Sequence, residues 1–127
     1  MDATERLDEA TRLCRRDALV DGGRAVGFAI RRGGRDVAGF VVAWDDRVHA
    51  FVNVCPHRGT TLDWKPGEVF DETGLYLICA THGAMFEPDS GRCIAGPCTG
   101  ARLQPIAVRV ADGFVELVND QLVTAAG

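Results

Sequence analysis

Hydrophobic and polar residues alternate along much of this 127-residue chain. In one segment Val26, Phe28 and Ile30 share a face with period two, and Gly33-Gly34 follows as a two-residue hairpin turn. No segment shows a helical period. The predicted strands are residues 13–15, 25–32, 35–44, 47–54, 75–78, 84–87, 102–110 and 113–118. Several short strands separated by turns predict an all-β domain of the sandwich or barrel-like kind.

The organisation expected from this pattern is a tail at residues 1–11, mobile or weakly helical, and a single domain at 12–127. The stretch 58–74 is the least regular. Trp64 within it is expected to pack under its own loop, and a docking aromatic is the alternative. The composition, 46% hydrophobic and 25% charged, is that of an ordinary globular domain.

Charge and hydropathy exclude several classes of function. With a net charge of −4, the chain is not expected to have the basic surface that nucleic acid binding needs. No apolar run is long enough to span a membrane, and the first residues are polar and acidic, unlike a signal peptide. We therefore expect a cytoplasmic protein whose acidic surface suits a basic protein partner.

Two short motifs carry the candidate chemistry. Cys55-Pro56-His57 and Cys79-Ala80-Thr81-His82 are 21 residues apart, and each supplies one thiolate and one imidazole. Four such ligands can hold a zinc ion or a 2Fe–2S cluster. Zinc modules with this ligand set usually keep both cysteines in one loop, whereas here the two types alternate. The pattern favours a cluster with two cysteine and two histidine ligands, the Rieske centre, and a structural zinc site is the alternative.

The sequence around these motifs resembles the Rieske family. Its C-P-H-R-G and C-x-x-H-G loops are present, and residues 82–88, Gly91-Arg92 and Gly96-Pro97 also match. The resemblance runs from about residue 37 to the C-terminus. It implies stacked antiparallel sheets with a cluster-binding part at about 53–98, made of two ligand loops and a covering Gly-Pro loop. It also implies one 2Fe–2S cluster per chain, with Cys55, His57, Cys79 and His82 as ligands.

The resemblance further assigns residues around the cluster. Gly83, Gly96 and Pro97 would shield it and allow close backbone approach. High-potential members of the family have two more cysteines, joined as a disulfide, where this chain has Thr60 and Thr81, and hydroxyl donors where it has Ala84 and Phe86. Because the side chains of Ala84 and Phe86 cannot donate a hydrogen bond to the sulfurs, we expect a low reduction potential. We predict about −200 to −50 mV, within the Rieske range.

The charge of the cluster explains the function that we expect. The charges of two ferric ions, two sulfides and two thiolates sum to about zero. A cluster with four thiolates would be a dianion, so adding one electron to the cluster with two thiolates is easier. The chain has no nucleotide-binding glycine motif and no ligand set for a mononuclear iron. It is therefore expected not to be catalytic alone, but to be a soluble Rieske-type ferredoxin that passes electrons from a reductase to an oxygenase. The alternatives are an accessory subunit of an oxidoreductase complex and a redox-sensing or interaction module.

The remaining cysteines and histidine have no assigned role. Cys14, Cys93 and Cys98 lie outside the two motifs, and free thiols are the default in a reducing compartment. A Cys93–Cys98 disulfide stays an open alternative, because closeness in sequence does not establish the geometry of a bridge. His49 lies in a predicted strand and is expected to be a surface or packed histidine.

Overall fold

The computed structural model describes residues 11–56, 61–63, 65, 67–79, 83–97 and 99–125. These residues form eleven strands and one 3-10 turn, η1 (Arg16–Ala18). No helix in these ranges is long and apolar enough to cross a membrane. The strands are β1 (Arg12–Arg15), β2 (Val26–Arg32), β3 (Arg35–Trp44), β4 (Arg47–Val52), β5 (Leu77–Ile78), β6 (Met85–Phe86), β7 (Cys93–Ala95), β8 (Pro105–Ile106), β9 (Val108–Ala111), β10 (Phe114–Leu117) and β11 (Gln121–Ala125).

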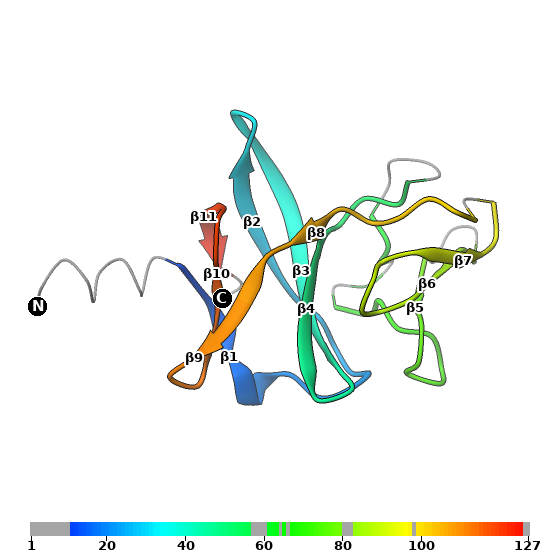
Figure 1. The fold of residues 1–127 in the computed structure, drawn as a ribbon, viewed down its shortest axis with the longest axis horizontal. Coiled ribbons are helices and arrows are strands. Elements are labelled where there is room, and N and C mark those ends of the chain that lie inside the picture. Colours follow the sequence, from blue (N-terminus) through cyan, green and yellow to red (C-terminus); the bar gives the residue numbers. More distant parts are fainter. Residues whose placement is uncertain are drawn as a thin grey trace, which may run out of the picture.

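The strands form three antiparallel sheets, which confirms the predicted fold class. The orders are β1-β10-β9, β11-β2-β3-β4-β8 and β5-β6-β7. The five-stranded sheet lies in the middle of the molecule, with the β1-β10-β9 sheet on one side and the β5-β6-β7 sheet on the other (Figure 1).

The hairpins of the central sheet turn where the sequence predicted. Gly33 and Gly34 join β2 to β3 with φ of 60° and 75°. Asp45 and Asp46 join β3 to β4 with φ of 54° and 60°. Two left-handed residues in a row match the right-handed twist of the strands that they connect. Aspartate tolerates this conformation better than most residues with a side chain.

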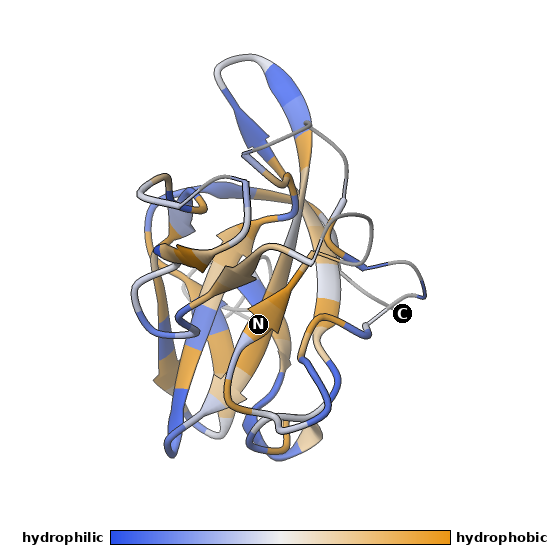
Figure 2. Ribbon diagram, turned by 90° about the vertical axis from the view of Figure 1, so that its right-hand side faces the viewer, coloured by the Kyte–Doolittle hydropathy of each residue, from blue (hydrophilic) through white to orange (hydrophobic). Residues whose placement is uncertain are grey.

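The structure has two hydrophobic cores, and strand β3 contributes side chains to both because its second half is buried on both faces. Phe40 and Val42 belong to the core between the central sheet and the β5-β6-β7 sheet. Val41 and Ala43 point the other way, into the core shared with β1 and β10. Hydrophobic residues concentrate along the strands, whereas the tip of the β2–β3 hairpin is hydrophilic (Figure 2). The alternation predicted for Val26, Phe28 and Ile30 is thus correct for β2, whereas the second half of β3 is buried throughout because a core lies on each of its faces.

Several of the predicted strands are shorter or broken in the structure. The segment 47–54 ends as a strand at Val52, because the amide of Val54 turns back to the carbonyl of Val52 (2.9 Å). The segment 75–78 keeps only β5. The segment 102–110 divides at Ala107, since β8 pairs with β4 and β9 pairs with β10.

Two strands were not predicted from the sequence. Strand β7 directly precedes Gly96-Pro97 of the covering loop, and it pairs with β6. Strand β11 pairs with β2 at the edge of the central sheet. Next to it Arg32 donates two hydrogen bonds to Asp120, at 3.1 and 2.7 Å. This pair attaches the C-terminal segment to the sheet and raises the pKa of Arg32.

A buried carboxylate lies in the β1-β10-β9 sheet. The side chain of Glu116 is 3% exposed and pairs with Arg109 on β9 (3.2 Å) and with Arg12 on β1 (3.7 Å). The guanidinium of Arg12 also lies over the ring of Phe114, 4.1 Å from its centroid. Because an unpaired charge is costly to bury, the two arginines compensate the charge of Glu116 inside the sheet.

His49 lies on β4 opposite Val42. Its ring packs against Trp44 at a centroid distance of 6.4 Å. Partial burial lowers the pKa of His49, although Asp89 opposes the shift. The imidazole is therefore neutral near pH 7, as a packed histidine is expected to be.

Candidate metal centre

The two candidate ligand cysteines lie in the same hydrophobic core. Cys55 follows β4 after a short turn and is 1% exposed, and Cys79 directly follows β5 and is fully buried. Both side chains belong to the core between the central sheet and the β5-β6-β7 sheet. The fold thus brings together two thiols that are 24 positions apart in the chain.

The loop that begins at Cys79 is a tight connection between β5 and β6. The amide of Cys79 donates to the carbonyl of Ala84 (2.8 Å), and the amide of Gly83 donates to the carbonyl of Cys79 (2.9 Å). Gly83 has a φ of 69°, which glycine adopts without strain. His82 and His57 lie outside the described residues, so their role as ligands remains a prediction from the sequence.

The Gly-Pro loop lies against this connection. The amide of Cys93 donates to the carbonyl of Ala101 (2.8 Å), and the amide of Gly100 donates to the carbonyl of Cys93 (3.1 Å). These two hydrogen bonds close the loop. A Cβ atom placed on Gly96 would lie 2.9 Å from the Cα of Ala84. The backbone of the Gly-Pro loop therefore touches the backbone beside the second ligand loop.

This contact predicts the effect of a small substitution. Gly96→Ala places a methyl group against the Ala84 backbone at a residue with a φ of 95°. We expect it to cost about 2 kcal/mol through overpacking and backbone strain. The readouts are the thermal midpoint and the rate at which iron is lost to a chelator. Gly100→Ala is the matched control, because it has a similar φ of 97° with open space around its Cβ. Equal iron loss from both variants would count against a shielding role for Gly96.

Ala84 and Phe86 line the same core and are fully buried. Neither side chain has a hydrogen-bond donor. Gly83, Gly96 and Pro97, in contrast, are exposed. Backbone hydrogen bonds fix the Cys79 loop, and the hydroxyl of Thr99 also donates to the carbonyl of Gly96 (2.8 Å).

Sequence reasoning missed a clamp on the first ligand loop. Asn53, two residues before Cys55, donates from Nδ2 to Asp63 (3.0 Å) and accepts from the amide of Leu62 (2.9 Å). Leu62 is fully buried in the same core as the two cysteines. An asparagine directly after a strand is the only local sign of this role.

Cys93 shares the core of Cys55 and Cys79, and its Sγ lies 3.3 Å from the carbonyl oxygen of Ala95. Its suggested partner Cys98 lies outside the described residues. Cys14 lies elsewhere, packed against the second core, where burial raises the pKa of its thiol. Trp64, Thr60 and Thr81 are also outside the described residues.

The site fits a 2Fe–2S cluster. Two buried thiols from different segments converge in one core, each in a loop whose motif also contains a histidine. Thiolates are the ligands that iron–sulfur clusters require, and the apolar surroundings exclude water, which helps to set the potential.

Comparison with known proteins defines the family. The family model for the Rieske [2Fe-2S] domain matches residues 10–116, which starts earlier in the chain than the resemblance noted above. The chain belongs to this family, and its cofactor is a Rieske-type 2Fe–2S cluster.

Solved structures show the same fold. The ferredoxin of Sphingomonas yanoikuyae B1 is similar, with a TM-score of 0.65, 27% identity, and coverage of 87% of this chain and 96% of that chain. So is the ferredoxin of carbazole 1,9a-dioxygenase from Nocardioides aromaticivorans IC177, with a TM-score of 0.63, 26% identity, and coverage of 84% and 94%.

A curated relative is the oxidoreductase NdmD of Pseudomonas putida. It is 34% identical over 88 residues, which are 64% of this chain. The match covers only 13% of the length of NdmD.

Proposed function

We propose that this protein is a cytoplasmic one-electron carrier that takes electrons from a reductase and delivers them to an oxygenase. Its cluster ligands are Cys55, His57, Cys79 and His82. The observation that carries the proposal is the burial of Cys55 and Cys79 in one core, within a fold that this chain shares with two ferredoxins along nearly their whole length. One of these is named as the ferredoxin of a dioxygenase.

The cluster and the residues around it have different roles in such a carrier. When bound, the cluster accepts and returns one electron. The chain keeps the two thiols out of water, fixes the second loop through the Cys79–Ala84 hydrogen bond, and presents exposed Gly83, Gly96 and Pro97 beside the ligand loops. Small exposed residues allow the surface of a partner to approach closely, which suits electron transfer between proteins.

The donor-free core supports a low reduction potential. With Ala84 and Phe86 buried and unable to donate, we expect a potential of about −200 to −50 mV, in the lower part of the Rieske range. Protein-film voltammetry measures it directly. Phe86→Tyr, which adds a hydroxyl donor, is expected to raise the potential, and Phe40→Tyr in the same core is the matched control. A wild-type value above about +150 mV would contradict this account of the site.

The experiment that tests the carrier role is stopped-flow reduction of the holoprotein, followed by mixing with an oxygenase. Fast oxidation coupled to substrate turnover supports a diffusing carrier. An accessory subunit would instead copurify with one oxidoreductase complex and exchange electrons only within it. A slow redox response that changes the binding of a partner would support a sensing module and contradict the carrier.

A further inference from the structure

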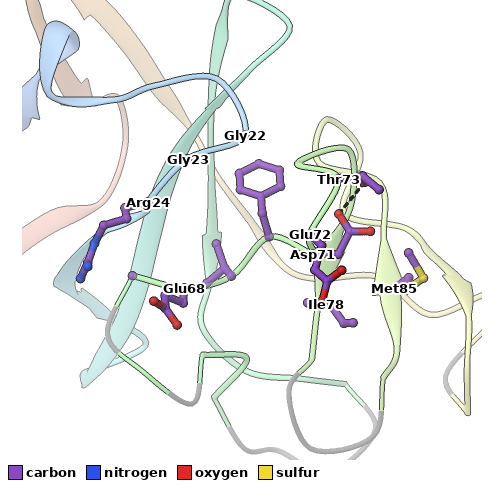
Figure 3. A pocket seen from close by; sticks show the side chains of 12 residues that line it. Gly22, Gly23, Arg24, Glu68, Asp71, Glu72, Thr73, Ile78 and Met85 are labelled. Carbon is purple, nitrogen blue, oxygen red and sulfur yellow. Dashed lines mark hydrogen bonds between the residues drawn. The ribbon is translucent and has the colours of Figure 1, made fainter.

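A groove of about 960 Å³ lies beside the candidate metal centre (Figure 3). One wall is the turn before β2, at Gly22 and Gly23, and the other is the segment 67–73. Its far end reaches Ile78 on β5 and Met85 on β6. Ile78 directly precedes Cys79, and Met85 directly follows Ala84. The groove therefore borders the two strands that carry the second ligand loop.

The walls of the groove are held by the backbone. The amide of Ala25 donates to the carbonyl of Gly67 (2.9 Å). A Cβ atom on Gly22 would lie only 2.7 Å from the carbonyl oxygen of Gly74. Since both walls are joined by such close contacts, the groove is preformed rather than opened by a ligand.

The lining of the groove combines apolar side chains with negative charge. Val69, Phe70, Ile78 and Met85 supply the apolar part. The charged lining residues are three carboxylates, Glu68, Asp71 and Glu72, against one guanidinium, Arg24.

Two of these carboxylates have no side-chain partner among the described residues. Asp71 accepts a hydrogen bond from the hydroxyl of Thr73 (2.8 Å). The exposed side chains of Glu68 and Glu72 make no hydrogen bond or ion pair within the part of the chain that the structure describes. An apolar groove edged by such carboxylates is complementary to an apolar side chain flanked by cations.

We infer that this groove docks a segment of the redox partner in which an apolar side chain is flanked by lysines or arginines. The inference rests on the proposed carrier function and names the chemistry of its partner. The apolar side chain lies against Phe70, Ile78 and Met85, while the cations pair with Glu68 and Glu72. Docking there holds the partner against the strands on either side of the Cys79 loop, and the carboxylates speed association by attracting the basic segment.

Binding of a labelled peptide to the oxidised holoprotein tests the inference. The probe is a short fluorescein-labelled peptide with a central leucine between lysines, followed by fluorescence anisotropy. We expect E68Q/E72Q to weaken binding about five-fold, because two cation–carboxylate pairs are lost. The matched control is D36N/D112N, which removes the same charge from two exposed residues at the β2–β3 and β9–β10 hairpins. It should bind like the wild type, and added salt should weaken wild-type binding.

Equal binding by E68Q/E72Q and the control would overturn the inference, and so would wild-type binding no tighter for the lysine peptide than for one with glutamates in place of the lysines. Replacing the leucine of the peptide by serine must also weaken binding, since otherwise the apolar lining has no role. No electron is transferred in these measurements. A failure here therefore leaves the carrier role standing, whereas a failure of the carrier role appears in the stopped-flow experiment.

Discussion

Cys79→Ala is expected to abolish cluster binding, and iron and acid-labile sulfide should fall to background. The thiol is fully buried in the core that also holds Cys55, and alanine supplies no ligand atom in its place. Cluster assembly and folding are coupled in small metalloproteins, so the variant should also be less stable. Iron and sulfide analysis of the purified protein measures the loss.

The matched control is Cys14→Ala, because Cys14 packs against the other core and belongs to neither motif. It should keep a full cluster. If the Cys79 variant retained as much iron and sulfide as the Cys14 variant, the proposed ligand set would be wrong.

Removing both partners of Glu116 is expected to destabilise the protein by about 3 kcal/mol at pH 7. In R12A/R109A the carboxylate, which is 3% exposed in the wild type, loses the guanidiniums at 3.7 and 3.2 Å. The thermal midpoint should fall by about 10 °C.

A third substitution isolates the charge. R12A/R109A/E116Q loses the same arginines, including the contact of Arg12 with Phe114, but buries no charge. It should therefore be more stable than the double variant. Equal midpoints for the two variants would show that the lost packing, and not the buried charge, accounts for the effect.

The sequence predicts β2, β3 and β4 of the central sheet well, because both signals there are local. Phe28 and Ile30 alternate with exposed or half-buried neighbours, and Gly33-Gly34 supplies the left-handed residues that a tight hairpin needs. The motifs likewise predict which residues are candidate ligands, since thiolate and imidazole chemistry is visible in the residue types.

What the sequence misses depends on tertiary pairing. Residues 121–125 lack a strong strand pattern and become β11 through pairing with β2, next to the Arg32–Asp120 ion pair. The break at Ala107 arises because β8 and β9 join different sheets. The Asn53 clamp and the contact of Gly96 with Ala84 also join residues distant in sequence, so no local pattern reveals them.

The central claim is that buried thiols from two loops hold a binuclear iron–sulfur unit in this chain. Metal and sulfide analysis combined with the EPR spectrum of the reduced, anaerobically purified protein tests it most directly. The account predicts two irons and two labile sulfides per chain, with an average g value below that of the free electron. A colourless protein that contains stoichiometric zinc and no labile sulfide would contradict it.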